Sequence, residues 1–198
     1  LVTAVNPPRK KRAFALLDLA GGTGDIAFRI AGAGGPGTHV TVADINAEML
    51  AVGRERAAKL GHDIEFIEAN AEKLPLPDKS FDAVTIAFGI RNVPRIDVAL
   101  DEAYRVLKIG GRALVLEFSA LRAAFLQPLY DFHSFQVLPR IGKLIAGDDA
   151  SYRYLAESIR RHPDQAALKA MMESVGFARV DVRNLSAGIV AIHRGYRV

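Results

Sequence analysis

The sequence contains no cysteine among its 198 residues. This absence excludes disulfide bonds, thiolate metal ligands and a cysteine nucleophile. No apolar run approaches the roughly 20 residues that a membrane-spanning helix needs. A charged segment followed by an apolar stretch, the pattern of a secretory signal peptide, is not visible either. Together these absences favour a cytoplasmic protein, with a peripheral membrane contact left open.

The charge is weakly positive, with a net value of +4 and an isoelectric point near 9.5. Such a charge allows anionic partners, but the basic residues are spread along the chain. Their one dense cluster is Arg9–Arg12, which we interpret as a solvated segment before the first strand. We therefore expect no nucleic-acid partner. The segment Asn6-Pro7-Pro8-Arg9 resembles a motif of amine-modifying nucleic-acid enzymes, but it precedes the first strand and so lies in the wrong place.

Strand-like and helix-like segments alternate along the chain, which predicts an α/β fold with a mostly parallel seven-stranded sheet. A helical insertion over about 121–160 is expected to cover the sheet. The last two strands, separated by a short glycine-containing turn, predict a C-terminal antiparallel hairpin. We expect one domain over residues 1–198. The expected strands are 16–20, 39–45, 64–69, 81–88, 112–118, 178–185 and 189–196, and the expected helices are 25–33, 47–60, 94–107 and about 163–175.

Local signals fix several helix ends. Asn46 is expected to cap the start of its helix, and Gly61 and Gly176 are expected to end theirs. Pro163 suits a first helical position, where Asp164 would favour the helix dipole. Gly110 and Gly111 are expected to turn the chain into the fifth strand.

A glycine-rich segment, Gly21-Gly22-Thr23-Gly24, directly follows the first strand and opens a helix. Glycines permit a tight turn with close approach of a ligand, and the helix N-terminus favours a carboxylate or phosphate. Residues 22–27 also fit the loose dinucleotide fingerprint G-x-G-x-x-A. This motif alone leaves a nicotinamide dehydrogenase, a methyltransferase or a purely structural turn open.

Two further sites follow the next strands. Asp44 lies at the end of the second strand, where an acid accepts both hydroxyls of a ribose. Asn70 and Ala71 follow the third strand, where a side chain and a backbone amide can meet an adenine edge. The Leu-Pro-Leu-Pro-Asp run over 74–78, leading to Phe81-Asp82, is typical of small-molecule methyltransferases and argues against a dehydrogenase.

From about residue 16 to the C-terminus, the chain resembles the UbiE-type ubiquinone/menaquinone biosynthesis C-methyltransferases. The resemblance implies the Rossmann-like fold of class I methyltransferases and S-adenosylmethionine as cofactor. It also implies C-methylation of a polyprenyl benzoquinol or a demethylmenaquinol. The segments that carry it are 18–25, 43–46, 88–93, 105–119, 151–159 and 193–196. Together with the motifs, the resemblance gives as cofactor-binding residues Gly22, Thr23, Gly24, Asp44, Asn70, Ala71 and Ala87.

The sequence departs from the family in three places. Ile109 stands where a proline is usual, which should matter little because the two following glycines remain. Ala87 replaces a frequent serine and so removes one hydroxyl contact to the cofactor. The family's N-terminal Asp-Met-Asn-Asp segment is absent, which predicts an open or incomplete substrate pocket.

The expected chemistry needs a cation or base, because an unperturbed phenol has a pKa of about 10. Arg91, at the end of the fourth strand, is the candidate that would stabilise a phenolate. Asp25 or a water would take the proton, and Asn92 would orient that water. The alternative is that Arg91 only pairs with a helix carboxylate.

Three histidines compete as the base. His133 is the one expected to face substrate, although a core or surface role is favoured for it. His162 is expected in a turn, and His193 away from the site. No histidines and carboxylates have metal-ligand spacing, so we expect no metal.

The aromatic segment 125–145 could line a channel for the polyprenyl tail, form a dimer face or belong to the core. A homodimer and a complex with other proteins of quinone biosynthesis are both compatible with the sequence. Two functional alternatives also stay open. One is a methyltransferase acting on another small molecule, and the other is a non-catalytic quinone-binding scaffold.

Overall fold

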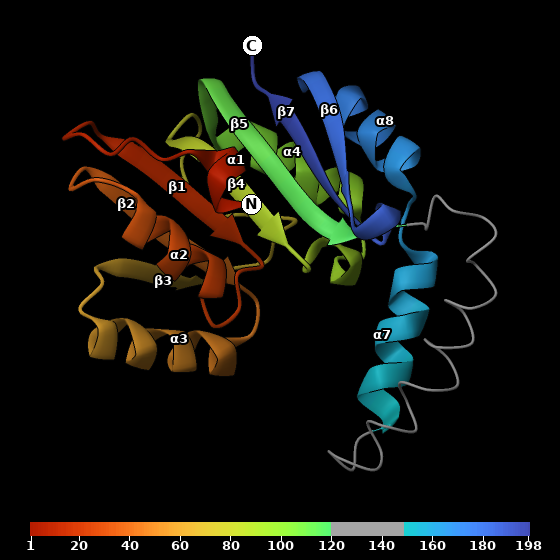
Figure 1. The fold of residues 1–198 in the computed structure, drawn as a ribbon, viewed down its shortest axis with the longest axis horizontal. Helices are drawn as coiled ribbons and strands as arrows, with labels where there is room; N and C mark the ends of the chain where they lie inside the picture. Colours follow the sequence, from red (N-terminus) through yellow and green to blue (C-terminus); the bar gives the residue numbers. More distant parts are fainter. Residues whose placement is uncertain (120–148) are drawn as a thin grey trace.

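Seven strands form a single twisted sheet in the computed structural model, which describes residues 1–119 and 149–198 (Figure 1). The sheet order is β3-β2-β1-β4-β5-β7-β6. The first five strands are parallel, whereas β7 runs antiparallel to both β5 and β6. This arrangement confirms the predicted fold. The strands are β1 Phe14–Leu19, β2 Thr38–Asp44, β3 Ile64–Glu68, β4 Phe81–Ala87, β5 Leu107–Phe118, β6 Ala178–Leu185 and β7 Val190–Tyr196.

Helices cover both faces of this sheet. One face carries α1, α2 and α3, and the other carries α4 and α8, while α7 projects past the carboxyl end of β5 (Figure 1). None of the helices in the described ranges is long and apolar enough to cross a bilayer. The helices are α1 Val2–Val5, α2 Asp25–Ala33, α3 Ala47–Leu60, α4 Ile96–Val106, α7 Asp149–Arg161 and α8 Gln165–Val175, with 3₁₀ turns η1 Ile90–Asn92 and η4 Ser186–Gly188.

Each face of the sheet has its own apolar core, because side chains alternate along every strand. Leu17 and Leu19 of β1 pack toward α4 and α8, where Leu100 and Met172 are fully buried. Leu16, between them in sequence, packs toward the α2 and α3 face. Burial on both faces explains why β1 and β4 are mostly apolar, with Asp18 in β1 and Asp82 and Thr85 in β4 as the exceptions.

The helix ends follow local chemistry. Asn46 caps α3 by accepting a hydrogen bond from the Met49 amide at 3.0 Å, and Gly61 ends that helix with φ +67°. Both predictions are confirmed. The start of α8 was predicted too early: Asp164 is the N-cap, accepting from the Ala167 amide at 2.8 Å, and Pro163 precedes the helix.

The start of β5 also differs from the prediction. Leu107 already pairs with Phe81 of β4, and pairing resumes at Ala83 and Arg112. Residues 108–111 therefore form an irregularity within β5, where Gly110 adopts φ +80°, and they do not form a separate turn.

Two short elements, α1 and η1, were not predicted, because four- and three-residue segments carry almost no periodicity. Within the predicted insertion, residues 149–160 belong to α7. The aromatic segment 125–145 and His133 lie outside the described residues.

Arg105 of α4 holds the segment between β3 and β4 in place. Its guanidinium donates to the carbonyls of Leu74 and Leu76 at 3.1 and 2.9 Å and to the carboxylate of Glu102 at 2.7 and 2.9 Å. Glu102 in turn accepts from the Leu74 amide, and its hydrogen bond with Arg105 lowers the pKa of that carboxyl. One side chain thus fixes the segment that follows Asn70 and Ala71.

We expect Arg105→Ala to lower the free energy of unfolding by about 2–3 kcal/mol, since a charged donor leaves several partly buried acceptors without a partner. Urea denaturation measures this. The matched control is Arg194→Ala, which removes an exposed ion pair with Asp181 and should cost under about 1 kcal/mol. Equal losses in the two variants would contradict a special role for Arg105.

Candidate active site

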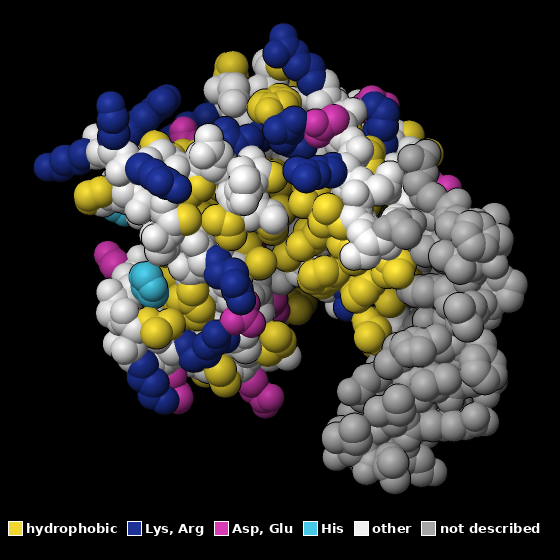
Figure 2. Space-filling view, in the orientation of Figure 1, with side chains coloured by type: hydrophobic (Ala, Val, Ile, Leu, Met, Phe, Trp, Pro, Cys, Tyr) yellow, Lys and Arg dark blue, Asp and Glu magenta, His cyan; other side chains and the backbone are white. Residues whose placement is uncertain are grey.

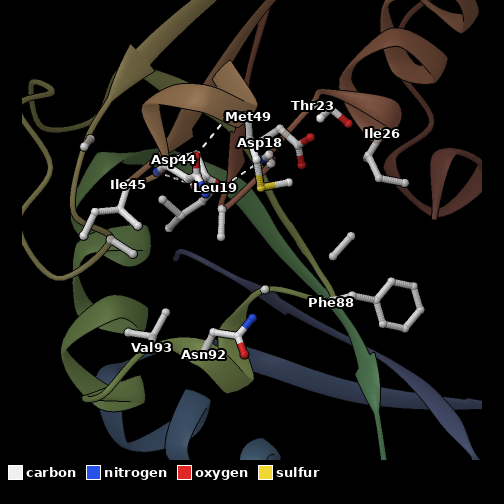
Figure 3. Close-up of a pocket in the computed structure, with 18 of the residues that line it drawn as sticks. Asp18, Leu19, Thr23, Ile26, Asp44, Ile45, Met49, Phe88, Asn92 and Val93 are labelled. Carbon is white, nitrogen blue, oxygen red and sulfur yellow. Dashed lines mark hydrogen bonds between the residues drawn. The ribbon is translucent and has the colours of Figure 1, made fainter. Parts of the chain in front are cut away.

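The strand order reverses beside β1, whose two neighbours are β2 and β4. In open α/β sheets, ligands bind outside the carboxyl ends of the strands at such a reversal. A pocket of about 760 Å³ lies there (Figure 3). Its lining is Asp18, Leu19, Ala20, Gly21, Gly22, Thr23, Asp25, Ile26, Arg29, Asp44, Ile45, Asn46, Met49, Ala69, Asn70, Ala71, Ala87, Phe88, Gly89, Asn92, Val93 and Pro94.

The glycine loop forms the floor of this pocket. Gly22 adopts φ +54°, and a Cβ built there would meet the Met49 side chain at 2.5 Å. The left-handed φ therefore favours glycine at position 22, whereas the clashing atom is the end of the flexible, exposed Met49 side chain, which can move aside. The N-cap of α2, Gly24, provides no side-chain acceptor, and the Ala27 amide of the first turn faces the Asp18 carboxylate. The earlier amides of this turn can therefore serve an anionic group of a ligand.

Gly24 lies at the start of α2 and is not among the residues that line the pocket. It is the N-cap of α2 at φ +83°, and it faces the rings of Phe28 and Phe66, outside the pocket lining. Gly24 therefore shapes the turn, whereas Gly22, Thr23 and Ala87 line the pocket.

Asp44 ties the loop to the end of β2. Its Oδ2 accepts from the Gly22 amide and its Oδ1 from the Asn46 amide, both at 2.8 Å (Figure 3). Each carboxylate oxygen keeps a further lone pair, which is what two ribose hydroxyls require. The exposed side chain of Ile45 lies beside it.

Asn70 and Ala71 also line the pocket. The Asn70 side-chain oxygen accepts from the Glu72 amide at 2.9 Å, which turns it back on its own loop. Glu72 is held by Arg95, whose backbone amide and guanidinium both donate to it, at 2.9 and 2.8 Å. The loop is thus fixed on both sides of Ala71.

Asp18 is a site residue that the sequence motif did not single out. It is 1% exposed, and its Oδ1 accepts from the Thr85 hydroxyl at 2.6 Å. Its buried Oδ2 has no hydrogen-bond partner. Burial raises the pKa of Asp18 from 3.8 to about 7, with the nearby Asp44 adding to this. The available signal was a carboxylate inside the apolar strand Phe14–Leu19.

Arg91 lies on η1 and is not among the pocket-lining residues. Its Nη1 is 2.8 Å from Oε1 of Glu117 and also donates to the Phe88 carbonyl. Glu117 is 1% exposed, and burial raises the pKa of its carboxyl. The charge of Arg91 is therefore balanced by a carboxylate, as in the alternative from the sequence, but that carboxylate lies on a strand and not on a helix.

Asn92 and Asp25 both line the pocket. The Asn92 side-chain oxygen accepts from the Tyr154 hydroxyl of α7 at 3.1 Å. Asp25 pairs with Arg56 of α3 at 2.6 Å, and Arg56 also donates to the Thr23 hydroxyl at 3.1 Å. Arg56 thus connects α3 with the start of α2, a contact that the sequence did not predict.

The described histidines lie away from the pocket. His193 is buried on β7, with Nε2 3.0 Å from the Gln165 carbonyl, and burial lowers its pKa. His162 directly follows α7, and burial lowers its pKa to about 4. Neither residue lines the pocket. Within the described ranges, no three histidine or carboxylate side chains are grouped as metal ligands.

With this geometry established, comparison with known proteins decides the family. The model of the ubiE/COQ5 methyltransferase family matches residues 3–197. This chain belongs to that family. It is an S-adenosylmethionine-dependent methyltransferase, as the resemblance implied.

Curated relatives agree with the family match. The chain is 58% identical over its whole length to the ubiquinone/menaquinone biosynthesis C-methyltransferase UbiE of Bradyrhizobium diazoefficiens, and it covers 79% of that protein. It is 60% identical to the UbiE of Methylobacterium nodulans, again covering 79% of it.

Solved structures share the fold at low identity. A methyltransferase from Aquifex aeolicus aligns with a TM-score of 0.68 at 18% identity, over 96% of this chain and 85% of the other. Phosphoethanolamine N-methyltransferase 2 of Haemonchus contortus, solved with S-adenosyl-L-methionine, aligns with a TM-score of 0.72 at 16% identity, over 99% and 52%.

The residues present fit S-adenosylmethionine. The partnerless Oδ2 of Asp18 is a buried carboxylate oxygen suited to the ammonium of the methionine part, and the open amides of α2 suit its carboxylate. Gly22 leaves the space that a Cβ would fill, and Asp44 stands ready for the ribose. When bound, the cofactor supplies an electrophilic methyl group.

We expect cofactor binding to depend on the ionisation of Asp18. Only the ionised carboxylate attracts an ammonium, so affinity for S-adenosylhomocysteine should fall as the pH drops through about 7 toward 5.5. In Asp18→Asn, the affinity at pH 7.5 should be about 10- to 100-fold lower and should lose this pH dependence. Calorimetric titrations between pH 5.5 and 7.5 measure both effects.

The control is Asp181→Asn, an exposed carboxylate on β6, which should keep the wild-type profile. The raised pKa of Asp18 also fixes a sign for stability: the free protein loses stability as the pH rises from 3.8, where the carboxyl ionises in the unfolded chain, to about 7, where it ionises in the folded one. Asp18→Asn should therefore unfold no earlier than wild type at pH 8. A variant with intact, pH-dependent affinity would contradict the assignment.

Proposed function

We propose that this methyltransferase transfers a methyl group from S-adenosylmethionine to a ring carbon of a polyprenyl benzoquinol or a demethylmenaquinol. The reaction would serve ubiquinone and menaquinone biosynthesis. The observation that carries the proposal is the whole-chain identity of 58–60% to relatives that bear this activity in their names. The substrate class is the chemistry that those names print.

The two ends of the pocket differ in a way that supports this substrate. Asp44, Ile45 and Met49 gather at one end, where the nucleoside would lie, whereas Ile26 and Phe88 lie on the opposite side (Figure 3). Thr23, Asp25 and Arg29 also line the pocket near Ile26, so what distinguishes this side is the aromatic ring of Phe88, which suits the flat ring of a quinol.

The chemistry balances without a metal or a redox partner. A phenolic hydroxyl loses its proton, charge moves to the neighbouring ring carbon, and a bond forms between that carbon and the methyl group as the bond to sulfur breaks. The ring carbon then loses its hydrogen as a proton and the hydroxyl is restored. The products are the methylated quinol, the neutral thioether and one proton.

Within this scheme, Arg91 is proposed to stabilise the phenolate, Asn92 to orient a water, and that water or Asp25 to accept the proton. Support comes from the position of Asn92 and Asp25 in the pocket lining. Arg91 is already paired with Glu117 and does not line the pocket. It would act either by turning toward the ring or by holding the Phe88 carbonyl and the η1 turn.

The substrate's polyprenyl tail is apolar, so the proposal includes an encounter with the membrane surface. Side chains of hydrophobic residues gather over the carboxyl ends of β4 and β5, where the surface is hollowed (Figure 2). The basic cluster Arg9–Arg12 lies before the amino end of β1, at the other end of the sheet. We propose that the apolar side approaches the bilayer.

Mass spectrometry of the reaction products tests the substrate. The purified chain, with S-adenosylmethionine bearing a deuterated methyl group, is incubated with a reduced demethylated benzoquinone or naphthoquinone carrying one isoprene unit. We expect a ring-methylated product that carries the label from at least one of them, and a higher rate when the quinol is presented in lipid vesicles. Asp44→Ala is the cofactor-site control and should lower the rate at least tenfold.

Failure to label either quinol while S-adenosylhomocysteine still binds would overturn the proposal. Labelling of another small molecule would then indicate a different acceptor. Absence of any labelled product would indicate a non-catalytic quinone-binding protein. In cells lacking the protein, quinone extracts should accumulate the demethylated ring.

For Arg91, we expect Arg91→Ala to lower kcat about 100-fold or more, because a phenolate loses its stabilising cation. The dissociation constant for S-adenosylhomocysteine should stay within about threefold, since Arg91 is outside the pocket lining. Arg91→Lys tests whether charge alone suffices, and Arg194→Ala controls for loss of an arginine elsewhere. Steady-state kinetics with the quinol decide, and unchanged turnover removes the role.

A further inference from the structure

Phe88 is the first residue beyond β4 and has an unusual backbone conformation. Its φ is +56°, a left-handed value that is a genuine outlier for a bulky side chain. Such a conformation is strained, and it persists only where surrounding contacts enforce it. The Phe88 side chain nevertheless lines the pocket and is 38% exposed. Core packing alone does not account for the strain.

Hydrogen bonds on both sides of the peptide hold this conformation. The Phe88 amide donates to the Leu116 carbonyl of β5 at 2.8 Å. The Phe88 carbonyl accepts from Arg91, which Glu117 holds at 2.8 Å from below the turn. The buried Arg91–Glu117 pair, which lies outside the pocket, thus has a direct contact with the backbone of a pocket residue.

A second aromatic side chain supports the Phe88 ring. The centroids of the Phe88 and Phe118 rings are 4.9 Å apart, with the planes tilted by 46°. The Arg91 guanidinium carbon lies 5.4 Å from the centre of the Phe118 ring. Cation and rings therefore form a contiguous group at the carboxyl ends of β4 and β5, and the Phe88 ring is backed on one side.

The residue after Phe88 cannot carry a side chain. A Cβ built on Gly89 would lie 2.6 Å from the Cβ of Ala20, at the end of β1. Phe88 and the glycine loop thus border the same opening. In the close-up, the Phe88 ring points away from Asp44 and Ile45 and lies on the side of Ile26 (Figure 3).

We infer that Phe88 is the platform on which the acceptor ring stacks, with its strained backbone directing the ring to the end of the pocket opposite the nucleoside. The inference rests on the proposed function and adds to it a specificity-determining contact: a flat aromatic acceptor with an accessible face. Aromatic pairs contribute beyond the area that they bury, so the contact would act mainly on acceptor affinity.

Steady-state kinetics with the reduced one-isoprene benzoquinone or naphthoquinone, whichever wild type methylates, test this contact. Phe88→Leu should raise the KM for the quinol about three- to tenfold, with the S-adenosylhomocysteine dissociation constant within twofold of wild type. Leucine is as restricted as phenylalanine at positive φ, so the backbone strain is matched. Phe88→Tyr restores an aromatic face and should return the KM to near wild type.

Ile45→Ala is the opposite control. It removes an exposed apolar side chain beside Asp44, so it should weaken S-adenosylhomocysteine binding and leave the quinol KM near wild type. The stacking role of Phe88 is wrong if Phe88→Leu leaves the quinol KM unchanged, or if Phe88→Leu weakens S-adenosylhomocysteine binding while Ile45→Ala raises the quinol KM. If Phe88→Leu raises the KM but Phe88→Tyr does so equally, the ring is not the determinant and the inference fails.

Wild type separates this outcome from failure of the proposed function. If wild type methylates neither quinol, the proposed substrate is wrong. If wild type methylates one of them and the Phe88→Leu and Phe88→Tyr variants have the same quinol KM, the proposed function is supported and the stacking role of Phe88 is wrong. Phe88→Asn serves as a folding check, because asparagine tolerates the left-handed conformation. It should keep wild-type thermal stability while showing the raised KM.

Discussion

The Asp44 carboxylate joins two parts of the chain that the pocket needs together. It accepts from the Gly22 amide of the glycine loop and from the Asn46 amide at the start of α3. Because Asn46 also caps that helix, the end of β2, the loop after β1 and α3 share one polar junction. The loop is thus held through its backbone amide by the Asp44 carboxylate before any ligand binds, and less conformational entropy remains to be lost on binding.

Around this junction the protein buries charge unevenly. Asp18 and Glu117 are each 1% exposed, and burial raises both pKa values. Glu117 is compensated within the protein by Arg91, whereas Asp18 has, among the described residues, no cation beside it and only neutral donors, the Thr85 hydroxyl and the Ala27 backbone amide. A buried carboxylate without a cation is costly, and a cationic ligand group supplies what the fold omits. Glu117 therefore supports the turn through Arg91, whereas Asp18 is available to recognise the cofactor.

Much of this arrangement could be predicted from the sequence. Strands that are buried on both faces are rich in apolar residues, which is why β1 and β4 could be predicted. Glycines mark the turn where a ligand approaches, which is why the Gly22 loop could be predicted. Asp44, Asn70 and Ala71 each follow a strand, and parallel strands bring their carboxyl ends to one edge. These positions depend on local pattern and sheet direction alone.

The parts that escaped prediction depend on tertiary pairing. Glu117 lies 26 residues from Arg91, and no periodicity indicates that they meet. In the sequence, Asp18 is only one polar residue within an apolar strand. Hydropathy cannot show that its second carboxylate oxygen lacks a hydrogen-bond partner. The left-handed backbone of Phe88 is equally invisible, since sequence rules assign that conformation to glycine or asparagine.

The placement of β7 has a consequence for the order of assembly. β7 follows β6 in the chain but lies between β5 and β6, paired along seven residues of β5 from Arg112 to Phe118. During synthesis, the glycine loop, Asp44 and Asn70 all emerge from the ribosome well before β7. Until β7 arrives, β5 is an open edge that can pair with another chain, and β6 has no strand to join. The nascent protein therefore carries its nucleoside-binding half while its sheet is still unfinished.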